Sequence, residues 1–206
     1  IKDEEIYLLE VNPRASRTAP FVSKAIGIQL AKVGALVMAG KKLHELELIN
    51  EIIPDYFSVK EAVLPFSKFP EVDVLLGPEM KSTGEVMGIG KSFGEAYFKA
   101  QRAAGVILPK TGNVFISVRD KDKPAICDIA KDLKKIGFEL FATGGTQSYL
   151  EKNNISCNKI NKVKEGQPHI VDMIKNGDVH LIINTTEGAR SIKDSFSIRK
   201  EANNNN

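Results

Sequence analysis

The stretch Gly137-Phe138-Glu139-Leu140-Phe141-Ala142-Thr143-Gly144-Gly145-Thr146 decides the fold of the second half of the chain. Its residues 138–142 suit a short strand, and a helix is predicted from residue 146 to residue 153. The two glycines between them allow close backbone approach, and the free N–H groups at a helix start favour a phosphate. Plain turn chemistry is the alternative explanation of the Gly-Gly pair.

The residues around this junction alternate between strand and helix patterns. Four strands are predicted, at residues 113–118, 138–142, 156–160 and 180–184. Three helices are predicted, at residues 122–136, 146–153 and 168–176. In the first helix Asp122 is the expected N-cap, and the expected core face is Ile126, Ile129, Leu133 and Ile136. This alternation is typical of an α/β fold with a doubly wound parallel sheet.

Polar and basic side chains follow the carboxyl ends of several of these strands. Ligands of doubly wound sheets bind beyond those ends, so we expect the side chains to share one crevice. Lysines on a surface are more often simply solvated, which is the alternative for each lysine taken alone. The candidate ligand-binding residues are Ser117, Lys123, Thr143, Thr146, Lys162, Asn184, Thr185 and Thr186.

The first half opens with a second candidate site in the run Ile6–Arg17, I-Y-L-L-E-V-N-P-R-A-S-R. Its apolar beginning predicts a buried strand, on which Glu10 and Asn12 would point to one side. Two oxygen ligands of this kind suit Mg²⁺, which is bound by few protein groups together with substrate phosphates. Arg14 and Arg17 follow, and arginine is well shaped to grip those phosphates. The alternative is an ordinary strand followed by an Asn-Pro turn.

The bulk properties describe a globular chain of one large or two small domains. The 206 residues carry a net charge of +3, too mild for a nucleic-acid surface. No apolar run approaches the ~20 residues of a membrane helix, so no membrane is expected. The two cysteines follow no disulfide or ligand spacing, which indicates reduced thiols and a cytoplasmic location. The tail Asn203–Asn206 is of low complexity and is expected to be unstructured.

The remaining elements place a domain boundary near residues 108–112. A helix is predicted over residues 19–39, a strand over 57–66 and a helix over 93–104. We therefore expect one domain at residues 1–105 and another at 106–206. Because a metal-binding strand begins almost at the first residue, which is Ile, the chain is expected to be a fragment.

The second half resembles the methylglyoxal-synthase-like fold. The resemblance rests on the segments Ile116–Arg119, Gly137–Thr146, Asn161–Gly166 and Ile182–Thr186. In the first half, E-V-N-P-R-A-S-R at residues 10–17 and G-P-E-M-K-S-T-G-E-V-M-G at residues 77–88 resemble the large subunits of glutamine-dependent, bacterial-type carbamoyl-phosphate synthases. The resemblance implies the C-terminal edge of an ATP-grasp domain followed by a methylglyoxal-synthase-like allosteric domain, truncated at its C-terminus.

The same resemblance implies a ligase that makes carbamoyl phosphate from bicarbonate and glutamine-derived ammonia with ATP, for arginine and pyrimidine biosynthesis. It implies Mg²⁺ or Mn²⁺ on Glu10 and Asn12, and a catalytic role for Arg14 and Arg17 on phosphates. It also implies a glutaminase small subunit, a homo-oligomer of heterodimers, a carbamate intermediate, and ornithine bound through Glu61. The effector pocket for UMP or IMP would comprise Ser117, Lys123, Thr143, Gly144, Gly145, Thr146, Lys162, Asn184, Thr185 and Thr186.

Two other classes of protein remain open. One is an active methylglyoxal-synthase-like or IMP-cyclohydrolase-like enzyme, and the other is a free-standing nucleotide-binding regulator. Methylglyoxal synthases use an aspartate base in a Gly-Gly-Asp segment, whereas the comparable residues 166–169 read Gly-Gln-Pro-His. The ATP-grasp-like strand argues against both classes. Without the nucleotide-binding lysine and Gly-rich loop of an ATP-grasp site, the fragment alone is expected to be inactive.

Overall fold

The computed structural model describes residues 2–48, 50–69, 73–77 and 79–205 of the chain. It contains two compact units, which are considered separately. The first unit comprises Ile1–Val63 and Gly84–Val106, and the second comprises Leu64–Thr83 and Ile107–Asn206. The domains expected at residues 1–105 and 106–206 stay a prediction, since the compact units have other bounds and group Leu64–Thr83 with the second unit.

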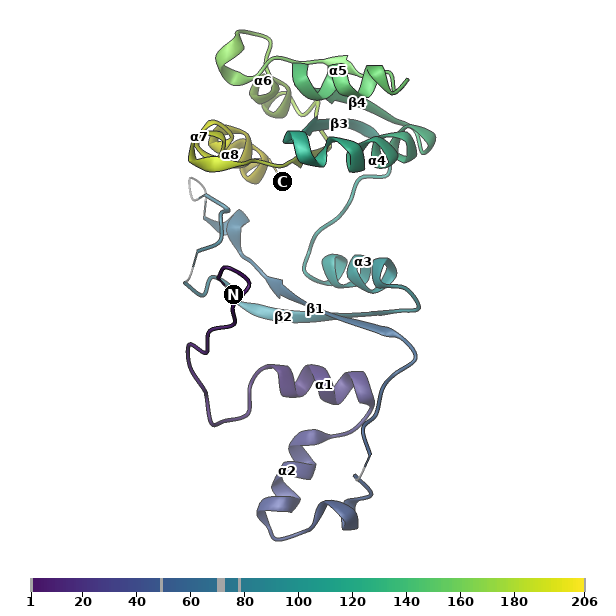
Figure 1. Ribbon diagram of the computed structural model, residues 1–206, viewed down its shortest axis with the longest axis vertical. Coiled ribbons are helices and arrows are strands. Elements are labelled where there is room, and N and C mark those ends of the chain that lie inside the picture. The colour runs from purple at the N-terminus through teal and green to yellow at the C-terminus, as the bar shows by residue number, and fades with distance from the viewer. Residues whose placement is uncertain (1, 49, 70–72, 78, 206) are drawn as a thin grey trace. The chain divides into compact units, whose positions relative to one another are not determined.

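An antiparallel hairpin covered by one helix forms the centre of the first unit (Figure 1). Strand β1 (Phe57–Val63) pairs with β2 (Gly84–Gly90) so that Phe57 lies opposite Gly90. Helix α3 (Phe93–Ala103) packs on this hairpin through Ala96 and Ala100, which are fully buried. The helix begins at Ser92, whose Oγ accepts a hydrogen bond from the N–H of Glu95 at 3.2 Å. The predicted strand and helix are both confirmed, and the strand ends three residues early.

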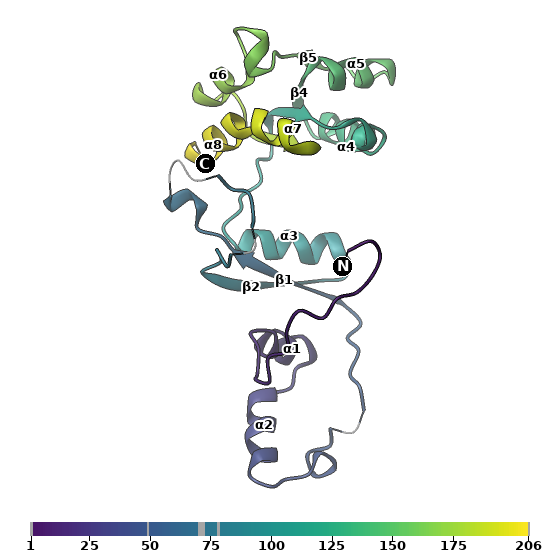
Figure 2. The same ribbon diagram turned by 60° about the vertical axis from the view of Figure 1, so that its left-hand side comes forward.

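The single helix predicted over residues 19–39 is instead a pair of short helices, α1 (Thr18–Ile26) and α2 (Leu30–Met38). The two helices are bent by 109° at the break between them, and Figure 2 shows this bend. Gly27 ends α1 in the left-handed region with φ of 74°, which glycine adopts without a steric penalty. The side chain of Ser23 completes the turn: its hydroxyl donates to the carbonyl of Ile28 and accepts from the N–H of Leu30 at 3.2 Å. A short 3₁₀ helix, η1 (Leu43–Leu46), follows.

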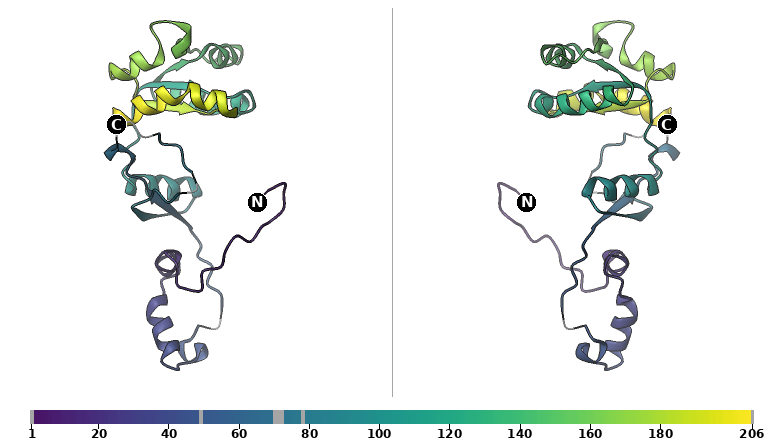
Figure 3. Two further views of the ribbon diagram at one scale, coloured as in Figure 1. Left: turned by 90° about the vertical axis from the view of Figure 1, so that its left-hand side faces the viewer. Right: turned by 90° about the vertical axis from the view of Figure 1, so that its right-hand side faces the viewer.

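The buried strand predicted at residues 6–11 is wrong for this structure. The segment is extended chain without a neighbouring strand, as Figure 3 shows, and Leu8 and Leu9 are 81% and 92% exposed. A strand forms only where a partner satisfies its backbone N–H and C=O groups. Among the described residues, the bridge nearest to this segment joins Lys2 to Glu5.

A four-stranded parallel sheet is the centre of the second unit, which confirms the predicted α/β class. Its strand order is β5-β4-β3-β6. The strands are β3 (Gly112–Ser117), β4 (Phe138–Ala142), β5 (Asn158–Lys159) and β6 (Leu181–Asn184). The helices are α4 (Lys123–Lys135), α5 (Gly144–Lys152), α6 (Ile170–Lys175), α7 (Gly188–Asp194) and α8 (Phe196–Asn204). The 3₁₀ helices are η2 (Phe66–Lys68), η3 (Asp120–Asp122) and η4 (Val163–Glu165).

Alternate residues of β3 belong to two different hydrophobic cores. Val114 and Ile116 pack with residues of α4 and α5, whereas Phe115 packs with residues of α6 and α8. All three side chains are fully buried. Because side chains alternate along a strand, this pattern shows that the sheet is covered on both faces.

The core face of α4 differs from the predicted one. Ile126 is buried as expected, but Ile129 and Ile136 are 48% and 62% exposed. Cys127 and Ala130 are buried in their place. The buried face of α4 is centred on Ile126, Cys127 and Ala130, so Ile129 lies at the edge of that face. The small side chains of Cys127 and Ala130 let the helix approach the sheet closely.

The chain end is helical, contrary to the prediction for the asparagine tail. Helices α7 and α8 were not predicted, and α8 includes Asn203 and Asn204. Ile198 anchors α8 in the second core, and Asn203 Nδ2 donates to the carbonyl of Phe66 at 3.1 Å. Packing therefore overrides the low helix propensity of asparagine. Residue 206 lies outside the described residues.

Within the described part of the chain, no single helix has the length and apolar character needed to cross a membrane. Helices α1 and α2 reach the necessary length and apolar character only when they are taken together, and the chain bends by 109° between them. Cys127 and Cys157 are free, and both side chains are buried, which the sequence did not predict.

Candidate functional site

A polar pocket lies where β3, β4 and β6 end in the second unit. Its volume is about 170 Å³. Ser117 is the last residue of β3, Thr143 follows β4 and Asn184 ends β6. The residues that line the pocket are Ser117, Thr143, Lys162, Val163, Glu165, Asn184, Thr185, Thr186, Ser191, Asp194, Ser195 and Ile198.

The parallel register of the sheet brings Ser117, Thr143 and Asn184 together. Ile116 pairs with Ala142, and Ser117 pairs with Asn184, so the residues that end the strands are neighbours. The hydroxyl oxygens of Ser117 and Thr143 are 3.3 Å apart. Thr143 is 4% exposed and is the N-cap residue of α5. The positive end of the α5 dipole therefore lies beside two hydroxyl groups.

Lys162 supplies positive charge to the pocket lining. It precedes η4, and its backbone N–H donates to Oε2 of Glu165 at 3.0 Å. Its side chain is exposed, and no other basic residue is among the described residues that line the pocket. Glu165 and Asp194 contribute carboxylates to the same lining, so the pocket offers both a cation and hydrogen-bond acceptors.

Thr185 and Thr146 have structural hydrogen bonds in addition to their predicted role. Thr185 Oγ1 accepts from the N–H of Arg119 at 3.1 Å, and its own N–H donates to the carbonyl of Ser117 at 3.0 Å. Thr146 is 1% exposed, and its hydroxyl accepts from the N–H of Val118 at 3.3 Å. Thr185 lines the pocket, whereas Thr146 lies behind the lining residues.

Lys123 is the first residue of α4, and Gly144 and Gly145 begin α5; none of the three lines the pocket. Lys123 Nζ is 2.6 Å from Oδ1 of Asp120 and 5.9 Å from the ring centroid of Tyr149. The hydrogen bond from Lys123 lowers the pKa of Asp120. A Cβ at Gly145 would lie 3.6 Å from Lys123 Nζ, and one at Gly144 would lie 3.4 Å from Cε of Lys159. Basic side chains thus flank both glycines.

Sequence reasoning missed six of the lining residues. Val163 and Glu165 belong to η4, and the other four belong to α7, α8 and their junction. These four, Ser191, Asp194, Ser195 and Ile198, are spaced i, i+3, i+4 and i+7. That spacing places them on one side of a helix and is a signal that the sequence carried.

The candidate metal ligands in the first unit contact each other. Asn12 Nδ2 donates to Oε1 of Glu10 at 2.9 Å, and both side chains are exposed. Arg14 is also exposed. Within the described ranges, no group of three or more His, Cys, Asp or Glu side chains gathers in a metal-binding arrangement. The structure therefore places the Glu10 carboxylate beside the Asn12 amide, with the amide nitrogen facing the carboxylate.

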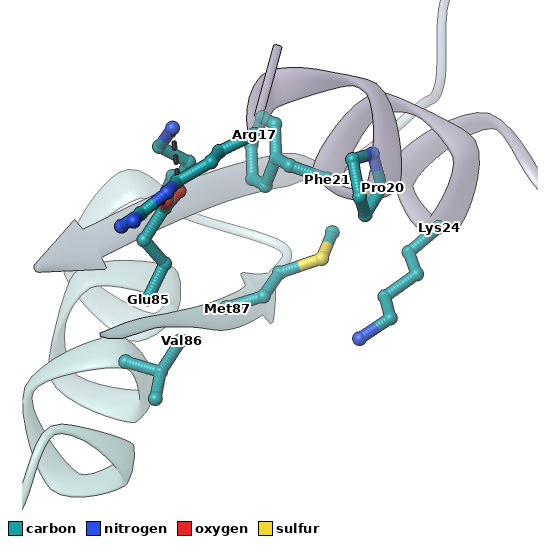
Figure 4. A pocket seen from close by; sticks show the side chains of 8 residues that line it. Arg17, Pro20, Phe21, Lys24, Glu85, Val86 and Met87 are labelled. Carbon is teal, nitrogen blue, oxygen red and sulfur yellow. Dashed lines mark ion pairs between the residues drawn. The ribbon is translucent and has the colours of Figure 1, made fainter. Parts of the chain in front are cut away.

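Arg17 lies in a different cluster, drawn in Figure 4. Its Nη1 is 3.6 Å from Oε1 of Glu85, whose Oε2 is 2.6 Å from Nζ of Lys60. The hydrogen bond from Lys60 is the main reason that the pKa of Glu85 is lowered. A pocket of about 240 Å³ adjoins this cluster and is lined by Arg17, Pro20, Phe21, Lys24, Lys60, Glu85, Val86 and Met87.

Glu61, the candidate ornithine ligand, lies on β1 opposite Val86 and is half-buried. It belongs to the first unit and is not among the residues that line either pocket. The structure therefore leaves it as a separate candidate.

The parallel sheet with a polar pocket at its strand ends belongs to a known domain class: residues 125–206 match the family model of the MGS-like domain. Residues 1–46 match the family model "Carbamoyl-phosphate synthase L chain, ATP binding domain". Both matches agree with the resemblance seen in the sequence.

Curated relatives carry the comparison over nearly the whole chain. The carbamoyl phosphate synthase large chain of Pseudomonas syringae pv. tomato is 60% identical over 202 residues, 98% of this chain and 19% of that protein. Those of Xanthomonas axonopodis pv. citri and Haemophilus ducreyi are 59% and 58% identical, over 97% and 98% of this chain and 18% and 19% of those proteins. This chain belongs to the carbamoyl phosphate synthase large-chain family, and it spans about a fifth of the length of these relatives.

Proposed function

We propose that the second unit binds a nucleoside monophosphate effector, UMP or IMP, in the pocket at the ends of β3, β4 and β6. The observation that carries this proposal is the convergence of Ser117, Thr143, Lys162 and Asn184 from four segments of the chain. A phosphate beside Thr143 would meet hydroxyl donors, the N-terminus of α5 and the Lys162 ammonium.

The rest of the pocket suits the neutral part of such a ligand. Glu165 and Asp194 supply carboxylate oxygens, which accept hydrogen bonds from ribose hydroxyl groups. Ile198 and Val163 supply apolar surface for a base. The volume of about 170 Å³ is below the usual range for sites that enclose a whole ligand, so part of the nucleotide would remain in solvent.

For the larger protein, we propose ATP-dependent synthesis of carbamoyl phosphate from bicarbonate and glutamine-derived ammonia, with carbamate as an intermediate. The proposal rests on the 60% identity and on the ATP-binding-domain match of residues 1–46. Glu10 and Asn12 would hold Mg²⁺ or Mn²⁺, since both offer hard oxygen atoms once the Asn12 amide is turned. When bound, the ion would neutralise phosphate charge. Arg14 and Arg17 would steady the phosphates.

Partners and location follow from the same proposal. They comprise a glutaminase small subunit, assembly into an oligomer of heterodimers, ornithine recognised through Glu61, and a cytoplasmic setting. In this arrangement the second unit senses effectors, and catalysis depends on parts of the protein beyond this chain.

The rival assignment to an active lyase or cyclohydrolase is less well supported. His169 is the N-cap residue of α6: its Nδ1 accepts from the N–H of Asp172 at 3.3 Å, and its own N–H donates to Asp172 Oδ2 at 3.0 Å. Neither residue lines the pocket. A general base must reach the proton that it abstracts, and this pair is committed to a helix cap.

Isothermal titration calorimetry on the full chain with UMP and with IMP tests the effector site. Lys162→Ala should weaken binding by about 1–3 kcal/mol, the range for losing a charge-assisted hydrogen bond. Lys135→Ala is the matched control, because this exposed lysine pairs with Asp132 on α4 and does not line the pocket. Equal affinities in all three proteins would remove the assignment.

Glu10→Gln in the complete synthase tests the metal proposal. It keeps the side-chain shape but removes the charge, so ATP-dependent carbamate phosphorylation should be lost while glutamine hydrolysis continues. Glu51→Gln is the control, since Glu51 is another exposed carboxylate of the first unit. Normal synthesis by the Glu10→Gln enzyme at ordinary Mg²⁺ would contradict the proposed role.

A further inference from the structure

Arg199 on α8 forms an extensive side-chain hydrogen-bond network outside the pocket of the second unit. Its Nε and Nη2 donate to the two carboxylate oxygens of Asp73 at 2.8 and 2.7 Å. Its Nη1 donates to the carbonyl of Ile192 at 3.1 Å and to the hydroxyl of Ser195. The side chains of Arg199 and Asp73 are 14% and 27% exposed, so the pair is partly shielded from solvent.

This network touches the wall of the effector pocket. Ser195 and Ile198 line the pocket, and Arg199 is the next residue of the same helix. Ser195 is 6% exposed, and its hydroxyl also donates to the carbonyl of Ile192 at 3.1 Å. A displacement of this wall therefore changes the position from which Arg199 reaches Asp73.

The other end of the network is the segment that joins β1 to β2. Asp73 Oδ1 also accepts a hydrogen bond from the N–H of Leu75 at 3.3 Å. The Asp73 carboxylate therefore bonds both to its own segment and to Arg199. One helical turn beyond Arg199, Asn203 Nδ2 donates a hydrogen bond to the carbonyl of Phe66. Helix α8 thus attaches the segment at two points. The segment is continuous with β1, which ends at Val63, and with β2, which begins at Gly84.

We propose that the Asp73–Arg199 pair transmits occupancy of the effector pocket to residues 64–69 and 73–77 of the β1–β2 connection. This inference rests on the proposed nucleotide site. Two parallel hydrogen bonds between a planar guanidinium and a carboxylate fix the relative orientation of the two groups, which a single hydrogen bond does not. A ligand that favours one position of Ser195 and Ile198 therefore also favours one position of Asp73. The coupling is the difference in ligand affinity between these two arrangements.

Hydrogen–deuterium exchange on the full chain, with and without saturating UMP, tests this coupling. UMP should slow exchange at residues 143–147, beside the pocket, and change exchange at residues 73–77. In Asp73→Asn the response at 143–147 should persist, while the response at 73–77 should disappear. Lys193→Gln is the matched control: it also removes one charge, from an exposed residue of α7, and should retain both responses.

A double-mutant cycle on UMP affinity gives a second readout. Asp73→Asn and Arg199→Gln should each change the dissociation constant by on the order of fivefold, and the double variant should change it no further, because both remove the same coupling. This readout compares ligand-bound and free protein within each variant, so a uniform loss of stability does not imitate it. If Arg199→Gln fails to fold, the exchange comparison with Asp73→Asn stands alone.

Three outcomes are informative. Loss of the response at 73–77 in Asp73→Asn, with binding retained, supports the coupling. UMP binding with no response at 73–77 in the unmodified chain overturns the coupling and leaves the nucleotide site intact. The absence of any UMP binding overturns both proposals.

Discussion

Gly88 on β2 lies against the backbone of α3 at Ala96. A Cβ built on Gly88 would stand 2.0 Å from the carbonyl oxygen of Ala96 and 2.5 Å from the backbone nitrogen of Ala100. Real Cβ atoms do not approach backbone so closely, so only glycine allows this helix to pack on the hairpin at its present distance.

Gly88→Ala should therefore destabilise the first unit, because α3 would have to move away from β2. Overpacking of this kind costs about 1–3 kcal/mol. Native-state hydrogen exchange of the α3 amides measures this loss in the unit concerned. Gly94→Ala is the control: Gly94 has open space around it, and alanine in a helix should be neutral or stabilising by up to about 1 kcal/mol. Equal protection in the two variants would show that α3 does not pack as described.

Acid should loosen the attachment of residues 73–77 to α8. The hydrogen bond from Arg199 is the main reason that the pKa of Asp73 lies below its ordinary value of 3.8. Because the folded pKa is lowered, the stabilisation is complete above about pH 4 and is lost as the pH falls through the folded pKa. The pair is partly exposed, so Asp73→Asn should cost about 1 kcal/mol or less at pH 7.

Exchange of the Leu75 amide between pH 6 and pH 3 follows this attachment, after correction for the intrinsic rate. Asp73→Asn should remove the pH-dependent step. A step of the same size in Asp73→Asn would assign the acid response to another group.

Cys157 should resist alkylation in the folded protein. Burial raises the pKa of its thiol to about 11, and the side chain is nearly covered. At pH 8 the thiolate fraction is then roughly one in a thousand, and thiolate is the reactive form. Iodoacetamide labelling followed by mass spectrometry should modify Cys157 only after denaturant is added.

The raised pKa of Cys157 also sets a direction for alkaline stability. The folded state retains the proton more strongly than the unfolded state, so this contribution is complete below the ordinary value of 9.0 and is lost as the pH rises toward 11. Rapid labelling of the native protein at pH 8 would contradict the described burial.

Neighbouring threonines after β6 should separate structure from binding. Thr185→Val leaves the N–H of Arg119 without its side-chain acceptor and should destabilise the second unit by about 1 kcal/mol. Thr186→Val should weaken UMP binding, since Thr186 lines the pocket, with a smaller loss of stability. Calorimetric titration and urea unfolding of both variants distinguish the two effects. Identical behaviour of the two variants in both measurements would refute this division of roles.

Much of the second unit was predictable because its signals are local. Strand β4 and the glycine turn after it are contiguous in sequence, and parallel strands necessarily bring their carboxyl ends together. Hence the sequence alone assigns Ser117, Thr143 and Asn184 to one crevice, and Lys162 joins them for the same reason. The sequence did not predict that Ala130, and not Ile129, lies on the buried side of α4, because hydrophobicity alone does not reveal how closely a helix approaches a sheet.

Residues 6–11 show the opposite case. Their apolar character favours a strand, but strand formation depends on a hydrogen-bonding neighbour, and none of the described residues provides one. The break at Gly27 was not predicted either. A glycine inside an apolar helical pattern is often tolerated, and the Ser23 side chain that completes the turn acts through the geometry of the folded chain.

Periodicity, short motifs and contiguous residues were enough to predict the α/β class of the second unit, the strand-end location of its polar site and the family to which the chain belongs. Three-dimensional packing was needed to show that α7 and α8 contribute residues to the pocket and that Arg199 binds Asp73, 126 residues away in the chain. Pairing across such a separation leaves no periodic signal, because any exposed acid and base are chemically compatible until folding selects one pair.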